Sequence, residues 1–163
     1  MPRPSGVFVV AILGARDLPD MDGPYCDLNL GAMEKRTSIT SGSGEVDWGK
    51  GGEAFWFPID HPELQKLEVE LFDEDTLSRD DLIGRTVVEV GDVAENGGGE
   101  EWRKLAGKDG GKEGNGMIHL ATSWLTPTTE RRRVDDKITR SGEPDMMLCL
   151  FVGTFTLGRD AKP

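Results

Sequence analysis

The chain has 163 residues, of which 36% are hydrophobic and 30% charged, and its formal net charge is −11. This composition is typical of one globular domain that buries its own core, and it excludes a largely disordered chain. The negative charge argues against nucleic acid as a partner and against permanent adhesion to anionic lipid, because like charges repel. No apolar run approaches the roughly 18 residues that a membrane span requires.

In chain order, short runs of β-branched, aromatic and alternating apolar residues predict strands. The expected strands are residues 6–13, 25–30, 37–40, 53–59, 67–72, 83–90, 102–105 and 117–124. Glycine-rich loops are expected at 97–99 and 107–116, and no segment has a convincing amphipathic helix pattern. Such a succession of short strands predicts an all-β fold, an eight-stranded antiparallel Greek-key β-sandwich.

The N-terminal and cysteine sequences bear on the cellular compartment. The N-terminus lacks the apolar core and small-residue cleavage site of a secretory signal peptide. The two cysteines, Cys26 and Cys149, lie in apolar strand-like runs far apart in sequence, which favours buried, reduced thiols over a disulfide. We therefore expect a cytoplasmic protein.

The sequence changes character after Trp124, where a polar stretch with the basic run Arg131–Arg133 precedes an apolar segment. The expected parts are a β-sandwich over residues 5–125, a polar linker over 126–145 and a C-terminal apolar extension over 146–163. The apolar strand in the extension is expected either to fold back onto the sandwich or to pair with a protein partner through residues 146–157.

The most informative segment is an acidic loop after the alternating strand 67–72. Five carboxylates fall within residues 73–81, and Asp73 and Asp75 form an Asp-x-Asp pattern with five residues between Asp75 and Asp81. Carboxylates about 4 Å apart repel by on the order of 4 kcal/mol at an effective dielectric near 20, so a cation would relieve the crowding. Oxygen ligands without histidine or thiolate suit Ca²⁺ or Mg²⁺. The loop is therefore a candidate calcium site.

The acidic loop has two other interpretations. An acidic loop on an acidic protein is often only a solvated turn. An EF-hand is poorly supported, because counting from Asp73 places Leu77, Ser78 and Gly84 where that motif requires a ligand, a glycine and a glutamate.

Five pieces of the sequence together resemble the C2 domain family. They are Ala15–Asp22 followed by Pro24-Tyr25, Trp48 with Phe55–Ile59, Phe72–Gly84, Glu101–Leu105 and Met117–Leu120. They occur in the order of the family's strands and loops and cover roughly residues 5 to 125. The resemblance implies a β-sandwich whose loops at one end bind Ca²⁺ and then dock on phospholipid head groups.

In this family the calcium ligands come from the first and third loops at that end. The resemblance places Asp73, Asp75 and Asp81 at the third-loop ligand positions. It places Asp22 at the first-loop position, but Gly23 stands where the family usually has a second Asp before the Pro-Tyr pair. The first loop is therefore expected to be shortened, and Asp20 is a candidate replacement if it reaches round a re-formed loop.

Ca²⁺ is coordinated by about six to eight oxygen ligands, and the shortened first loop supplies fewer of them. We therefore expect a Ca²⁺ affinity weaker than about 10 µM without lipid. Lipid phosphates would add ligands and tighten binding. The expected function is Ca²⁺-dependent association with anionic phospholipid membranes, in which the ions cancel the repulsion between the acidic loops and the bilayer. At the loop tips, Met21, Leu77 and Arg79 are expected to contact the membrane.

Two other classes of function stay open from the sequence alone. A Ca²⁺-independent interaction module is supported by the missing ligand, the acidic surface and the C-terminal segment, whose residues 156–160 loosely repeat residues 13–17. An enzyme is not expected, because His61 and His119 lack a neighbouring nucleophile pattern and the glycine-rich segments lack nucleotide-binding patterns. Asp73 and Asp81 fit an acid–base pair poorly, since such pairs need shielded carboxyls with separated pKa values.

Overall fold

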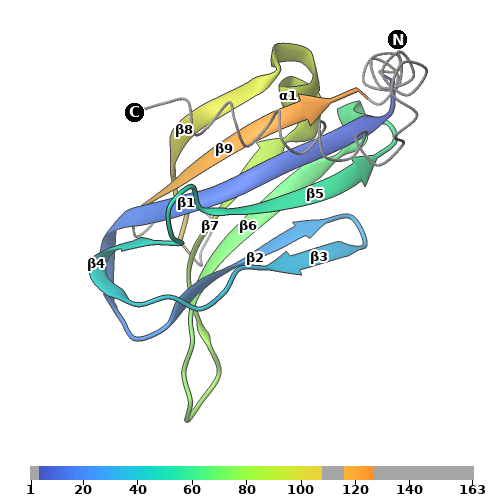
Figure 1. Ribbon diagram of the computed structural model, residues 1–163. Coiled ribbons are helices and arrows are strands. Elements are labelled where there is room, and N and C mark those ends of the chain that lie inside the picture. The colour runs from blue at the N-terminus through green and yellow to red at the C-terminus, as the bar shows by residue number, and fades with distance from the viewer. Residues whose placement is uncertain (1–3, 108–115, 127–163) are drawn as a thin grey trace, which may run out of the picture.

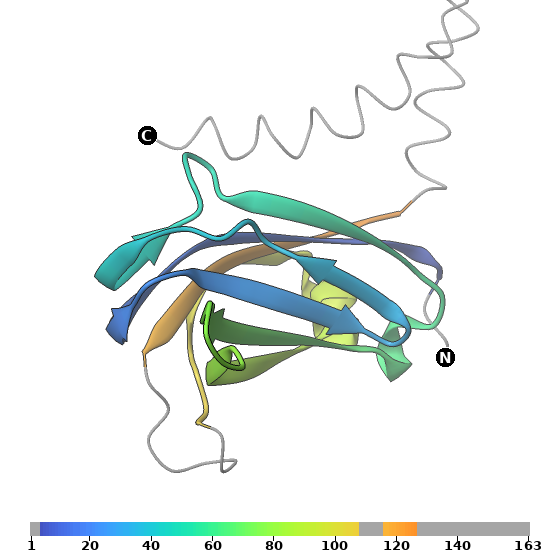
Figure 2. The same cartoon turned by 90° about the horizontal axis from the view of Figure 1, so that it is seen from below.

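The protein is described here by a computed structural model that covers residues 4–107 and 116–126. Its strands are β1 (Gly6–Met21), β2 (Pro24–Leu30), β3 (Met33–Arg36), β4 (Gly42–Asp47), β5 (Glu53–Ile59), β6 (Lys66–Asp73), β7 (Asp81–Glu89), β8 (Gly98–Lys104) and β9 (Met117–Leu125). A short 3₁₀ turn, η1 (Pro62–Leu64), lies between β5 and β6, and one helix, α1 (Val90–Asn96), lies between β7 and β8. The two sheets lie face to face, as Figure 2 shows.

The strands form two antiparallel sheets, which confirms the predicted β-sandwich (Figure 1). In the larger sheet, β1 is bordered on one side by β9, which pairs with β8. On its other side β1 pairs with β5 over its first half and with β4 over its second half. The smaller sheet has the order β3-β2-β6-β7. The core lies between these sheets because each strand turns alternate side chains inward.

β1 supplies the clearest example of this alternation. Phe8, Val10 and Ile12 are fully buried in the core cluster, where Phe8 lies 6.3 Å from Phe57 between ring centroids. From the other sheet, Leu28 and its neighbours meet them. The alternating apolar residues of the sequence thus account for the core that positions the loops.

β1 is longer than the sequence predicts, and this changes the loop that follows it. The expected strand ended at residue 13, whereas β1 continues to Met21 and pairs there with Gly42 of β4. The register shifts between Arg16 and Asp20, and Asp17 has a φ of 58°, which lets the strand bend and continue. As a result, the connection from β1 to β2 contains only residues 22 and 23.

Four other local predictions were wrong, and the described residues contain nine strands instead of the eight predicted. β4 was missed because Gly42 and Gly44 read as a turn, and β8 begins inside an expected glycine loop. The expected strand at 37–40 is displaced to 33–36. Helix α1 was missed because its seven residues are too few for a clear helical period.

Several predictions fall on residues that the structure does not describe. These are residues 127–145 of the expected linker, the extension 146–163 with Cys149, and residues 108–115 of the expected loop between β8 and β9. Cys26 is described, and it is free and buried with a pKa raised first by burial.

Candidate functional site

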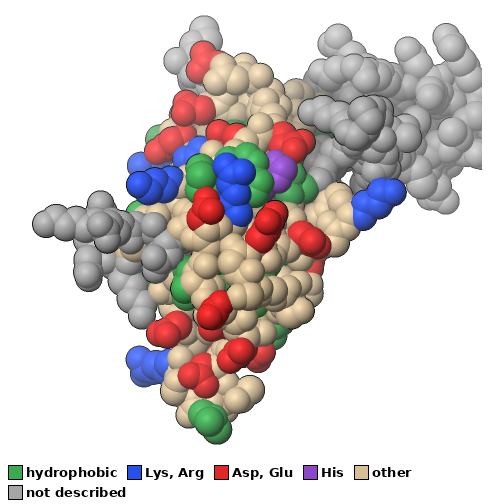
Figure 3. Space-filling model, turned by 90° about the vertical axis from the view of Figure 1, so that its left-hand side faces the viewer, with side chains coloured by type: hydrophobic (Ala, Val, Ile, Leu, Met, Phe, Trp, Pro, Cys, Tyr) green, Lys and Arg blue, Asp and Glu red, His purple; other side chains and the backbone are tan. Residues whose placement is uncertain are grey.

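Two acidic connections meet at one end of the sandwich: the β1–β2 turn (residues 22–23) and the β6–β7 hairpin loop (residues 74–80). The Oδ1 atom of Asp73 accepts hydrogen bonds from the backbone N–H of Asp22 at 3.0 Å and of Gly23 at 2.9 Å. The N–H of Glu74 donates to the Gly23 carbonyl at 2.9 Å. We call this end the acidic rim, and Figure 3 shows acidic side chains gathered there with a hydrophobic side chain at its tip.

The hairpin loop is held by its own carboxylates. Asp75 accepts hydrogen bonds from the N–H of Leu77 at 2.8 Å and from the hydroxyl of Ser78 at 2.6 Å. These bonds, that of Ser78 first, lower the pKa of Asp75. Asp80 in turn accepts the N–H of Asp75 at 3.1 Å. The hairpin is therefore shaped by bonds to carboxylate groups that also remain candidate ligands.

Tyr25 joins the base of the hairpin to the smaller sheet. Its hydroxyl donates to Asp80 at 2.5 Å, its ring stacks on Phe72, and the Arg36 guanidinium lies 4.5 Å from the ring centroid. Burial, and then the bond to Asp80, raises the pKa of Tyr25 to about 12, while the Tyr25 hydroxyl is the main cause of a lowered pKa at Asp80. Neither the Tyr25 contacts nor the role of Asp80 as their acceptor was predicted from the sequence, although the Pro24-Tyr25 pair was a signal.

This contact predicts the titration of the chain's single tyrosine. A folded-state pKa above the unfolded value stabilises the fold below the unfolded pKa, and this contribution is lost as pH rises through the folded pKa. We therefore expect Tyr25 to stay protonated above pH 10 and to ionise near pH 12, as read from tyrosinate absorbance while circular dichroism reports an intact sheet. Asp80→Asn should lower this midpoint. A midpoint of 10 in the folded wild-type protein would contradict the contact.

The structure brings only some of the predicted ligands together. Asp73 contacts the Asp22 backbone, and Asp81 is the Cα partner of Asp73 at the end of the β6–β7 ladder. The side chain of Asp75 turns into its own hairpin. Asp20 lies in β1 opposite Ser43 and accepts a hydrogen bond from the Ser43 hydroxyl. Asp20 is therefore part of a strand and not of the re-formed loop that was expected to carry it.

The predicted membrane contacts divide in the same way. Met21 is only 8% exposed and belongs to the core cluster, so its expected place at an exposed loop tip is wrong. The cause is the extension of β1, which makes Met21 an inward-facing strand residue. Leu77 is 95% exposed at the hairpin tip, and Arg79 is also exposed.

The rim fits Ca²⁺ in chemistry more than in arrangement. Its acidic side chains offer hard oxygen atoms, which Ca²⁺ prefers. Within residues 4–107 and 116–126, however, no three histidine, cysteine, aspartate or glutamate side chains are grouped to hold a metal. A bound ion would have to compete with the backbone N–H groups that already donate hydrogen bonds to Asp73 and Asp75.

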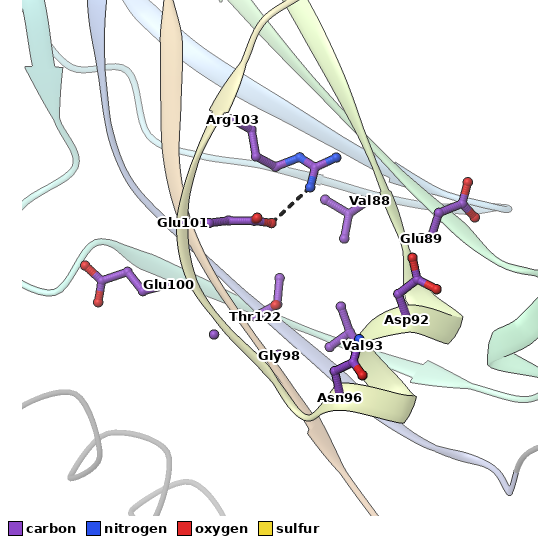
Figure 4. A pocket seen from close by; sticks show the side chains of 11 residues that line it. Val88, Glu89, Asp92, Val93, Asn96, Gly98, Glu100, Glu101, Arg103 and Thr122 are labelled. Atoms are coloured by element: carbon purple, nitrogen blue, oxygen red, sulfur yellow. Dashed lines mark hydrogen bonds and ion pairs between the residues drawn. The ribbon is translucent and has the colours of Figure 1, made fainter.

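A separate cavity of about 410 Å³ lies between α1 and strands β7, β8 and β9 (Figure 4). Four carboxylate side chains line it: Glu89, Asp92, Glu100 and Glu101. Arg103 is the single cation of the lining, and it already contacts Glu101 at 2.9 Å, Thr86 at 3.0 Å and the Val87 carbonyl at 2.6 Å. The cavity is therefore poorly suited to an anionic ligand such as a lipid head group.

The two described histidines have structural partners. His119 stacks on Trp102 with ring centroids 4.4 Å apart and lies 2.8 Å from Glu100, while His61 lies 3.5 Å from Glu63.

In the part of the chain that the structure describes, no helix is long and apolar enough to cross a membrane.

Comparison with known proteins gives a family match for most of the sandwich. The family model of the C2 domain matches residues 6–105. Extended synaptotagmin-3 of Mus musculus is 29% identical over 161 residues, covering 93% of this chain and 17% of the relative. Extended synaptotagmin-3 of Homo sapiens is 31% identical over 139 residues, covering 80% of this chain and 15% of the relative. The chain thus matches only a small part of each relative's length.

Solved structures give the same picture. A calcium-bound pair of C2 domains, A and B, of Extended-Synaptotagmin 2 matches with a TM-score of 0.66 and 25% identity, covering 83% of this chain and 53% of that one. The first C2 domain, domain A, of plant Extended Synaptotagmin 1 matches with a TM-score of 0.64 and 18% identity, covering 76% of this chain and 97% of that one. The second likeness supports the fold alone.

Proposed function

We propose, because the chain belongs to the C2 domain family, that it is a non-enzymatic module that associates with anionic phospholipid membranes through its acidic rim. This proposal rests on the two hydrogen bonds from the backbone of Asp22 and Gly23 to Asp73, which join the two acidic connections at one end of the sandwich. The resemblance to C2 domains supports lipid docking at this end of the sandwich.

Ca²⁺ is proposed as a weak ligand of this rim, held by Asp22, Asp73, Asp75 and Asp81. When bound, the ion supplies positive charge that offsets the repulsion between these carboxylates and lipid phosphates. The side chains must first give up protein hydrogen bonds, such as those from Leu77 and Ser78 to Asp75. This competition supports an affinity weaker than about 10 µM in the absence of lipid.

The hairpin tip is proposed to contact the bilayer directly. Leu77 presents an almost fully exposed apolar side chain, and burying it in the head-group layer would contribute about 1.5–3 kcal/mol. Arg79, exposed nearby, is proposed to contact anionic head groups, where a basic residue contributes about 1 kcal/mol.

Vesicle co-sedimentation tests this function. With phosphatidylserine vesicles we expect more protein in the pellet with Ca²⁺ than with chelator, and Asp75→Asn/Asp81→Asn should remove most of that difference. The matched control is Asp60→Asn/Asp92→Asn, which makes the same charge change at exposed residues near η1 and α1, at the other end of the sandwich. The control should retain the wild-type response. Equal responses of the two double variants would argue against the rim.

A second candidate function is a Ca²⁺-independent interaction module. It is favoured by the hydrogen bonds that Asp73, Asp75 and Asp80 already accept from the protein. It is also favoured by Gly23 at the position where a further first-loop acid was expected. Calorimetry without heat at millimolar Ca²⁺, both with and without phosphatidylserine vesicles, would select this candidate over the first.

A further inference from the structure

The outer face of the larger sheet is apolar at its centre. On β1, Val7, Val9 and Ala11 point away from the core, because Phe8, Val10 and Ile12 between them belong to the core cluster. Val9 is the Cα partner of Trp56 on β5, Ala11 is the partner of Ala121 on β9, and Val7 is the partner of Leu125. We call these six outward-facing residues, Val7, Val9, Ala11, Trp56, Ala121 and Leu125, the outer apolar face.

This face differs from the usual solvent side of an antiparallel sheet, where polar residues alternate with apolar ones. The first half of β1 is instead a continuous apolar run, which is typical of a strand buried on both sides. The inner side is covered by the smaller sheet and by helix α1, which contributes Val90 and Val93 to the core. Val9 and Ala11 at the centre of the outer apolar face are fully buried, and Trp56 is 38% exposed. Among the described elements none forms a layer over this face.

The chain itself carries a segment suited to this face. Residues 146–152 are seven consecutive apolar residues without a charge, in a chain that is 30% charged. β9 ends at Leu125, which belongs to the outer apolar face, so the chain leaves the sheet at this surface. The 20 residues of 126–145 span at most about 70 Å when extended, far more than a few strands spaced about 4.8 Å apart.

Charge favours the same occupant. Residues 127–163 contain seven lysine and arginine residues against six acidic ones, whereas the whole chain has 19 against 30. The C-terminal part therefore carries a slight positive charge, and the remainder carries all of the net negative charge. Attraction between the two parts brings the apolar segment toward the acidic sandwich.

We propose that residues 146–157 pack on the outer apolar face and form the missing layer of the larger sheet. This inference is independent of the acidic rim and of Ca²⁺. It assigns the extension to an intramolecular contact, instead of to the edge of a partner's sheet.

A spin label on the full chain tests the contact. A thiol-specific nitroxide reagent should label Cys149 selectively, because the other thiol, Cys26, is fully buried and has a raised pKa. The amides of Val9 and Leu125 and the indole of Trp56 should then lose most of their NMR intensity compared with the reduced label. The amide of Val87, paired with Glu68 in the smaller sheet, should keep its intensity. Unchanged intensities at the outer apolar face would overturn the proposal.

Two further measurements complete the test. Mixing spin-labelled, unenriched chains with isotope-enriched, unlabelled chains should cause no loss of signal, since loss there would assign the face to a second copy. Trp56→Glu should restore the Leu125 signal in the spin-labelled chain, while the control Val87→Glu, a charge at a similarly exposed position of the other sheet, should not. Retained broadening in a folded Trp56→Glu variant would also overturn the proposal.

Discussion

Replacing Phe57 by alanine is expected to lower the free energy of unfolding by about 3–5 kcal/mol. The Phe57 side chain is fully buried on the inner side of β5, and its ring centroid lies 6.3 Å from that of Phe8. Removing the ring loses its burial and leaves a cavity, because neighbouring side chains in a packed core relax only partly. Guanidinium unfolding monitored by circular dichroism measures the change.

Leu64→Ala is the control for the Phe57 variant. Leu64 is also a large apolar residue, but it is 76% exposed in the turn η1. Its truncation should change the free energy of unfolding by no more than about 0.5 kcal/mol, as is usual for surface positions. Similar losses in the two variants would show that Phe57 does not occupy the core described above.

The fold was predictable where side-chain alternation is strong and local. β5 is an example, because its aromatic residues alternate between the core at Phe57 and the outer side at Trp56. The same reasoning located β2, β6 and β9 to within one residue at each end. These segments carry their own pattern, so knowledge of their partners was not required.

The parts that the sequence did not predict depend on distant partners. Met21 becomes a core residue only because β4 pairs with the second half of β1, and the glycines of β4 give no sign of a strand. The Tyr25 hydroxyl donates to Asp80, whereas Asp81 pairs with Asp73 at the end of the β6–β7 ladder, whose register shifts between Leu71 and Phe72. A pattern of carboxylates along the chain does not contain this information.

The acidic rim was therefore predicted in composition but not in bonding. Asp22 and Asp73 were predicted to be neighbours because they resemble ligands of one ion. In the structure, their contact is a hydrogen bond from the Asp22 backbone to the Asp73 side chain. Asp73 thus has a role in the fold that is separate from metal binding.

Asp73→Ala is accordingly expected to lower the free energy of unfolding by about 1–3 kcal/mol. The substitution removes the common acceptor of two backbone N–H groups, at 3.0 Å from Asp22 and 2.9 Å from Gly23, and a lost partner costs about that much. Chemical denaturation without Ca²⁺ measures this effect, so that ion binding does not contribute.

Asp75→Ala provides the matched comparison, because it removes the same charge from the next acid of the Asp-x-Asp pattern. The partners of Asp75 lie within its own exposed hairpin, where water replaces the lost carboxylate, so its stability should change little. If Asp75→Ala costs as much stability as Asp73→Ala, the effect comes from removing a negative charge from the acidic rim. The hydrogen bonds between Asp73 and the β1–β2 turn would then not be its cause. A larger cost at Asp73 alone would establish that its carboxylate joins the β1–β2 turn to the hairpin, and would explain why ion binding at this rim has to compete with the fold.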